Sequence, residues 1–196
     1  MIDKSKRRAT VEQYGPMLIV RMTGGPDCLW LNMYLDAETG QMTCDSDIGF
    51  YAYHWGKHNP KYESFLQFCC RWLSDEEWLL RKCIGEQHMP LQFDRDITVE
   101  SLRKEYAEWH DAENLDTFDF EDALDEAYAY HDKDSWCTAF QIAADANGVE
   151  LPEEWWGCIC EKYTPWQMRF AEICREVIVP EIEKVIGCDG RLPKES

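Results

Sequence analysis

The sequence predicts an α+β fold, with an N-terminal antiparallel sheet of about four strands followed by a mainly helical C-terminal half. Up to Trp55, short apolar or alternating runs are separated by turns rich in Gly and Asp, which is typical of sequential antiparallel strands. After this residue, apolar side chains recur at helical spacing. A length of 196 residues fits one domain, or one domain with a helical extension.

The predicted strands follow one another closely. One lies within residues 10–23, where the stretch 17–22 is apolar and β-branched. Residues 28–36 alternate, so that Leu29, Leu31, Met33 and Leu35 are expected on one face. Two further strands are expected at 41–47 and 49–55, and the last of them places Tyr51 and Tyr53 on one face. Short turns between these runs favour an antiparallel meander.

Helical patterns then continue along the chain. A first helix is expected at 62–73, and Ser74 with Glu77 forms a capping-box pattern for a second helix at 75–84. Thr98 is the expected N-cap of the next helix, whose buried stripe should contain Leu102, Tyr106 and Trp109. Further helices are predicted at 118–130 and 135–147. Thr164, followed by Pro165, marks another helix start, and Pro180 should end or kink that helix.

These patterns suggest three parts. Residues 1–9 are a flexible basic arm, residues 10–93 hold the sheet and two helices, and residues 94–196 form an acidic helical region. We expect the last two parts to pack together as one domain.

The composition excludes several classes of function. A net charge of −18 opposes direct binding to nucleic acid or to an anionic membrane. No apolar run is long enough for a membrane span, and the N-terminus lacks the apolar core of a secretory signal, so a cytoplasmic location is expected. The ten cysteines show no secreted disulfide pattern and are expected to act as small buried hydrophobic residues.

The negative charge is concentrated in the middle of the chain. Residues 94–161 contain 20 Asp and Glu against 4 Lys and Arg, whereas the rest of the chain is close to balanced. Apolar residues interleave with these charges, which distinguishes the segment from a disordered acidic tail. The candidate partner-binding residues are Asp111, Glu113, Asp116, Asp119, Glu121, Asp122, Asp125, Glu126, Trp155 and Trp156. A solvated helix face that only keeps the protein soluble is the alternative.

No motif for catalysis, a metal or a cofactor withstands inspection. His54 and His58 lie four apart, but Gly56 between them opposes the helix that such a metal-binding pair needs. Asp45 and Asp47 begin like a calcium loop that lacks its later ligands. Cys158 and Cys160 match no standard zinc spacing, and no nucleotide-binding glycine loop is present. We therefore expect a non-enzymatic protein without cofactor or metal.

One part of the chain resembles a known group of proteins. The pattern Asp47-x-Gly-x-Tyr-x-Tyr-x-Trp55, followed by Phe65-Leu66-Gln67-Phe68, is similar to a pattern in small bacteriophage and prophage proteins. Ile48 stands where that pattern usually has an aromatic residue, and the resemblance covers only residues 40–85. It implies a phage origin and no particular mechanism.

Taken together, these features suggest a phage-encoded protein acting in the host cytoplasm. It would bind a basic, nucleic-acid-handling protein of host or phage through its acidic helices, as a defence inhibitor of the anti-CRISPR or DNA-mimic type. One alternative is a metal-dependent enzyme or metal-binding protein built around His54 and His58. Another is a structural module that forms a homodimer through exposed tryptophans.

Overall fold

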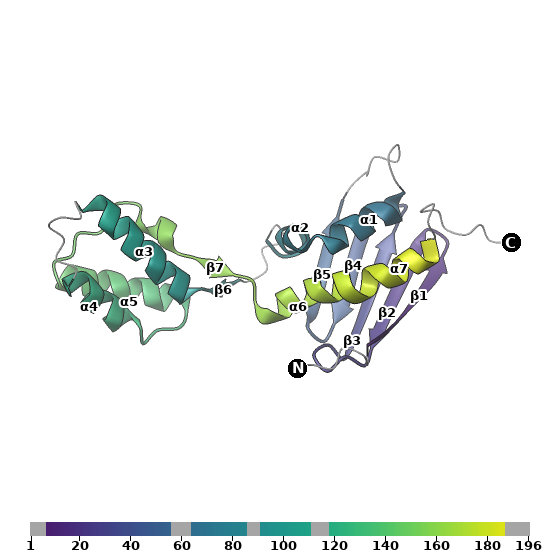
Figure 1. The fold of residues 1–196 in the computed structure, drawn as a ribbon, viewed down its shortest axis with the longest axis horizontal. Helices are drawn as coiled ribbons and strands as arrows, with labels where there is room; N and C mark the ends of the chain where they lie inside the picture. Colours follow the sequence, from purple (N-terminus) through teal and green to yellow (C-terminus); the bar gives the residue numbers. More distant parts are fainter. Residues whose placement is uncertain (1–6, 56–63, 86–90, 111–117, 187–196) are drawn as a thin grey trace. The chain divides into compact units, whose positions relative to one another are not determined.

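The computed structural model describes residues 7–55, 64–85, 91–110 and 118–186. The chain forms two compact units, the first made of residues 1–90 and 163–196 and the second of residues 91–162 (Figure 1). The second unit begins close to the expected boundary after residue 93, while the C-terminal helices group with the sheet and not with the acidic helices. That the two parts pack as one domain stays a prediction.

An antiparallel meander forms the sheet of the first unit, with its strands in sequence order. Its strands are β1 (Arg8–Tyr14), β2 (Met17–Thr23), β3 (Trp30–Asp36), β4 (Gln41–Ser46) and β5 (Gly49–His54). The α+β prediction is confirmed, with five strands where about four were expected, because residues 10–23 contain a hairpin. Gly15, at a φ of 57°, makes the tight turn between its strands. β1 starts inside the stretch expected to be a flexible arm.

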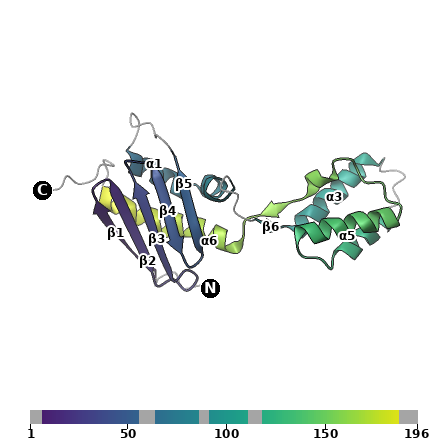
Figure 2. The same ribbon diagram turned by 180° about the vertical axis from the view of Figure 1, so that it is seen from behind.

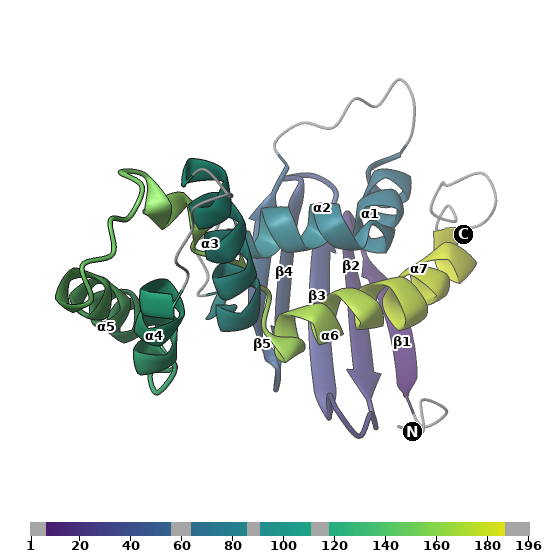
Figure 3. The same ribbon diagram turned by 60° about the vertical axis from the view of Figure 1, so that its left-hand side comes forward.

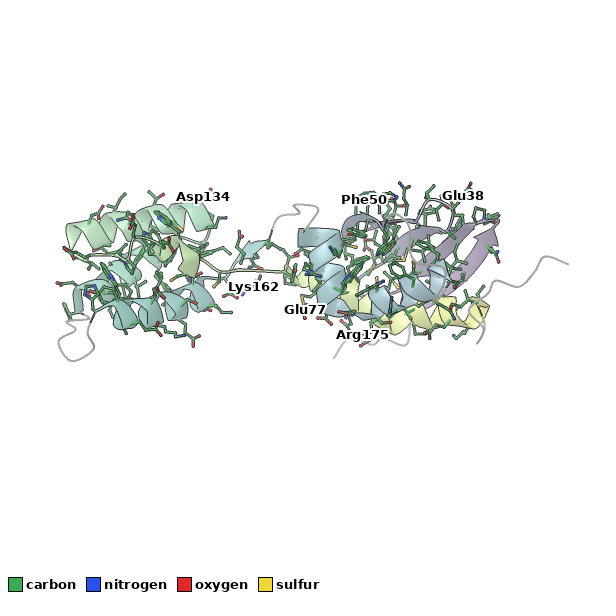
Figure 4. All side chains as sticks on the ribbon, turned by 90° about the horizontal axis from the view of Figure 1, so that it is seen from above. Glu38, Phe50, Glu77, Asp134, Lys162 and Arg175 are labelled. Atoms are coloured by element: carbon green, nitrogen blue, oxygen red, sulfur yellow. The ribbon has the colours of Figure 1, made fainter. Side chains whose placement is uncertain are left out.

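Helices cover one face of this sheet (Figures 1 and 3). They are α1 (Phe65–Ser74), α2 (Glu76–Leu80), α6 (Pro165–Ile173) and α7 (Val179–Ile186). Leu31, Met33 and Leu35 are fully buried on this face, as their alternation predicted. The placement of Leu29 with them is wrong, because β3 begins only at Trp30 and Leu29 is 64% exposed. Figure 2 shows the opposite face, which no described helix covers, and Phe50 lies there with 59% of its surface exposed (Figure 4).

The aromatic residues of β5 join the sheet to the helices. Tyr51 stacks on Phe170 of α6, with ring centroids 3.7 Å apart. Trp55, which follows β5, packs against Trp78 and edge-on against Phe65. These rings are therefore core residues of the first unit, where burial of large aromatic surfaces stabilises the sheet–helix contact.

The N-terminal boundaries of α6 and α2 are set by their capping residues. Thr164 caps α6 as predicted, with a reciprocal capping box to Gln167. The predicted capping box at Ser74 is wrong, because Ser74 is the last residue of α1 and its hydroxyl donates to the carbonyl of Cys70. Asp75 caps α2 instead, accepting the N–H of Trp78. Both Ser and Asp suit such a position, and the carboxylate occupies it.

Pro180 does not end its helix. A π-helical segment, η4 (Cys174–Ile178), lies between α6 and α7, and Pro180 is the second residue of α7. A wide π turn changes the hydrogen-bond pattern just before the proline, which lacks an N–H of its own. The chain therefore continues past the proline as helix. A second π-helical segment, η2 (Arg81–Gly85), extends α2.

A buried ion cluster ties the start of β1 to α6. Both carboxylate oxygens of Asp27 accept hydrogen bonds from Arg7, at 2.9 and 3.0 Å, and Asp27 also pairs with Arg169. The Arg7 side chain is only 2% exposed. Removing one member of a buried cluster of this kind leaves an uncompensated charge in the protein interior.

The second unit is a small helical domain. It consists of the short strands β6 (Gln92–Phe93) and β7 (Glu161–Lys162), the helices α3 (Arg95–Trp109), α4 (Phe118–Ala127) and α5 (Lys133–Ala146), and a 3-10 turn η3 (Trp155–Cys158). β6 and β7 pair where the chain enters and leaves the unit. Its core is aromatic: Trp136 stacks on Phe140, and Tyr106 stacks on Phe120.

The predicted N-cap at Thr98 is wrong. α3 starts at Arg95, and Asp94 caps it by accepting the N–H of Ile97. Thr98 lies fully buried inside the helix, where its hydroxyl oxygen accepts the N–H of Cys160. The threonine hydroxyl thus accepts a hydrogen bond from a residue far away in the sequence and does not cap the helix.

Two further expectations concern the cysteines and the membrane. Seven of the nine described cysteines are buried, and burial raises the pKa of Cys28, Cys70 and Cys83 to about 12. Such thiols are unreactive and fill space, as predicted. Across the described ranges, no helix combines the length and the apolar character that a membrane crossing requires.

Candidate protein-interaction surface

Helix α4 carries the densest group of candidate residues. Phe120, Ala123, Leu124 and Ala127 are buried against the core of the second unit. Of the other six positions, the first holds Phe118, which is 69% exposed, and five hold carboxylates, those of Asp119, Glu121, Asp122, Asp125 and Glu126. At about 100° per residue, these five positions fall within an arc of about 160° on the side away from the core. The carboxylates of α4 thus share one face, and at its first turn this face also carries the exposed ring of Phe118.

Only one edge of this acidic face is neutralised. Arg103 of α3 donates to both carboxylate oxygens of Glu121, at 2.8 and 2.6 Å. These hydrogen bonds hold the pKa of the Glu121 carboxyl below its ordinary value, against an opposing effect of desolvation. Glu121 therefore links two helices. The other four carboxylates of α4 are solvent-exposed and form no ion pair within the described residues.

The basic residues of the second unit leave most of its acidic surface without a counter-charge. Each of the five described Lys and Arg side chains has a carboxylate within ion-pair distance, and only Arg103 pairs with α4. Lys133 pairs with Glu161, and Lys162 pairs with Asp94. The surplus of negative charge predicted from the sequence is therefore present at the surface of this unit.

Other acidic residues of the segment have local roles or point outward. Asp132 caps α5 by accepting the N–H of Ser135, and this hydrogen bond lowers the pKa of its carboxyl. Asp134, in the first turn of α5, is exposed and points away from the helix (Figure 4). Three predicted residues, Asp111, Glu113 and Asp116, lie outside the described residues.

The two tryptophans singled out by sequence occupy different environments. Trp155 is 2% exposed, and its indole N–H donates to the side chain of Gln141. Trp156 packs on Trp155, with ring centroids 3.8 Å apart and ring planes tilted by 31°, and is 55% exposed. Trp155 thus supports the surface from within the core, and Trp156 presents its ring to solvent.

Trp156 borders a surface groove of about 510 Å³. We call it the Trp109–Trp156 groove; the lining residues that matter here are Trp109, Asp145, Glu150, Leu151, Glu153 and Trp156. Trp109, at the end of α3, is 49% exposed. The carbonyl of Glu150 lies 3.3 Å from the ring Nε2 of His110, the residue after Trp109, and this contact ties the loop to the end of α3. The groove therefore combines indole rings with carboxylates.

The alternative of a metal site around His54 receives no support from the geometry of the described residues. His54 Nε2 lies 3.0 Å from the carbonyl oxygen of Thr39, and His58 lies outside the described residues. Asp47 accepts the N–H of Leu29 at 2.8 Å and so shapes the start of β3. Within the part of the chain that the structure describes, no group of three or more His, Cys, Asp or Glu residues could hold a metal.

Sequence reasoning did not find the Trp109–Trp156 groove. Trp109 was expected in the buried stripe of α3, yet half of its surface is exposed. Its proximity to Trp156 results from the packing of η3 against α3, which no local pattern in the sequence reports. Apolar spacing predicted the helix correctly and did not show that its last turn extends beyond the core.

Comparison with known proteins gives an origin for the chain. A search of the curated proteins and a search of the solved structures each found no match. A family model described as a phage family, Phage_phiTE_072, matches residues 11–186. The match extends well beyond residues 40–85, which carried the resemblance. It confirms the expected relationship to phage proteins. The aromatic motif itself stays a prediction. The chain belongs to this family of phage proteins.

Proposed function

We propose that this phage-family protein binds a basic, nucleic-acid-handling protein of the host or of the phage through the acidic face of α4. The exposed carboxylates of Asp119, Asp122, Asp125 and Glu126 provide the principal contact. In this proposal the protein acts in the host cytoplasm, without enzymatic activity, as an inhibitor of a defence complex. A row of carboxylates on a helix can occupy a site that normally receives the phosphates of DNA, as in DNA mimics and some anti-CRISPR proteins.

One observation carries the proposal: four neighbouring carboxylates are held on one side of a folded helix and form no ion pair with any described residue, although Arg103 lies near enough to Asp125 to interact with it electrostatically. Asp122 and Glu126 are four residues apart and Asp122 and Asp125 three apart, so their charges repel each other on the helix surface. Such an arrangement costs stability, and a positively charged partner would relieve the repulsion on binding. Long-range attraction would also speed association and make it sensitive to salt.

The test uses two variants that remove the same number of charges. The α4-face variant combines Asp119→Asn, Asp122→Asn, Asp125→Asn and Glu126→Gln. It leaves Glu121 in place, so that the contact between α3 and α4 is preserved. The matched control combines Glu38→Gln, Asp45→Asn, Glu77→Gln and Glu183→Gln, which are exposed residues of the first unit.

Each purified protein is used to capture partners from host lysate at low and at high salt, and captured proteins are identified by mass spectrometry. We expect the wild type and the matched control to retain the same basic nucleic-acid-binding protein at low salt. The α4-face variant should lose it, and high salt should release it from the wild type and from the matched control. Equal capture by the α4-face variant and the matched control would refute the proposal.

The homodimer alternative rests on the exposed tryptophans Trp156 and Trp166, which are 55% and 58% exposed. Light scattering of the purified protein separates the two functions. A monomer that captures a basic protein supports the proposal, and a stable dimer without a captured partner supports the structural module.

A further inference from the structure

We propose that the Trp109–Trp156 groove binds an arginine-containing segment of the partner protein. The inference rests on the proposed partner-binding function and adds a second contact, separate from α4, with a defined chemistry. An arginine side chain would lie against the exposed face of Trp156, with its guanidinium directed toward the carboxylates of Glu150 and Glu153.

The aromatic part of the groove is held in place from below. Trp156 packs on Trp155 at a tilt, and Trp155 is fixed by its hydrogen bond to Gln141 and by its edge-on contact with Phe140. Gln141 in turn donates to the carboxylate of Asp145, at 3.0 Å. The exposed indole is thus supported by the core of the unit, so little side-chain entropy is lost when a ligand packs on it.

The electrostatic character of the groove selects a cation. Asp145, Glu150 and Glu153 line it, and no Lys or Arg is among the described lining residues. Their carboxylates form no ion pair with any described residue. A cation placed over an indole ring is attracted by the ring's negative face, and nearby carboxylates add to this attraction. An anion or a nucleic acid would be repelled.

Size and shape favour arginine within a protein segment. A groove of about 510 Å³ lies in the range of ligand-binding pockets and holds more than one side chain. Guanidinium is planar, stacks on aromatic rings and can bind carboxylates through several N–H donors, whereas the lysine ammonium is compact and more strongly hydrated. Leu151 supplies an apolar contact for the aliphatic part of the arginine side chain.

The experiment titrates the full chain with a short capped peptide that carries two arginines in a Gly–Ser background. Binding is measured by calorimetry, and the Trp156 indole N–H is followed by NMR. We expect saturable binding that weakens about tenfold in Trp156→Ala. The peptide with lysines should bind more weakly, and the peptide with neutral citrullines should bind weakest.

Two controls make the result specific. Trp166→Ala removes a tryptophan of similar exposure from α6, in the first unit, and should bind the peptide as the wild type does. Glu150→Gln combined with Glu153→Gln leaves the rings in place, so it tests the charges without disturbing the stack, and it should weaken binding and reduce its salt dependence.

Equal affinities of the wild type and Trp156→Ala, or equal binding of the arginine and citrulline peptides, would overturn the inference. So would a dimer in solution that buries Trp156. The outcome is separable from that for α4, because the α4-face variant should still bind the peptide. If the groove does not bind arginine, the peptide titration shows it. If the acidic face of α4 does not bind the partner, the lysate capture shows it.

Discussion

The two units of this protein build their interiors alike and their surfaces differently. In the first, Tyr51 stacks on Phe170 between sheet and helix; in the second, Tyr106 of α3 stacks on Phe120 of α4. The first unit pairs charges of both signs, including the buried cluster around Asp27. The second exposes carboxylates in excess of its basic residues. Because a good core forms with either surface, the acidic face of α4 is not a requirement of folding.

The largest effects should come from the two cores, and they should be similar. Phe170→Ala in the first unit and Phe140→Ala in the second each remove a fully buried ring. Each should lower the free energy of unfolding of its unit by about 3–5 kcal/mol. Chemical denaturation, followed by circular dichroism and tryptophan fluorescence, measures the loss. A cost below about 1 kcal/mol in one unit would contradict the view that both cores are built alike.

A smaller effect should distinguish the buried charges of the first unit from the surface charges of the second. Asp27→Asn removes the carboxylate that Arg7 and Arg169 share, so it should cost about 3 kcal/mol. The control, Asp96→Asn, affects a carboxylate that is 84% exposed and 4.0 Å from Arg95, so its cost should stay below about 0.5 kcal/mol. Denaturant midpoints compare the two variants, and equal costs would refute the distinction.

The smallest predicted effect concerns Glu121, and it depends on pH. Its pKa is lowered in the folded state by Arg103, so its contribution to stability is fully present above the ordinary pKa of a glutamate and disappears as the pH falls through the lower pKa of the folded state. Because both side chains are about half exposed, Glu121→Gln should cost less than about 1 kcal/mol at neutral pH. Unfolding of the wild type and Glu121→Gln should converge in acid. A difference that stays constant at all pH values would show that the Arg103 contact does not depend on charge.

Local patterns in the sequence predicted local features of this structure. Alternation placed Leu31, Met33 and Leu35 on one face, and the Thr164–Pro165 pair marked a real helix start. The hairpin at Gly15 was missed although the dipeptide Gly15-Pro16 is a turn signal, because only the apolar run that follows it was interpreted as a strand. Capping was misassigned at Ser74, where the neighbouring Asp75 has an equally suitable side chain.

Features that depend on contacts between distant residues could not be predicted. Arg7, Asp27 and Arg169 form one ion cluster although Arg169 lies far along the chain, and no spacing rule relates them. The same holds for Trp109 and Trp156, which meet only through the packing of η3 on α3. Charge density identified the acidic segment, while the structure was needed to show that α4 displays its carboxylates on one side and that Glu121 is already paired.

The central claim is that the acidic face of α4 serves binding and not folding. It is tested most directly by measuring, side by side, the free energy of unfolding and the affinity for the captured partner in the α4-face variant and the matched control. The account predicts that the α4-face variant is at least as stable as the wild type, because repulsion is relieved, and that it binds the partner about tenfold or more weakly. A variant that loses stability while it keeps its affinity would contradict the account.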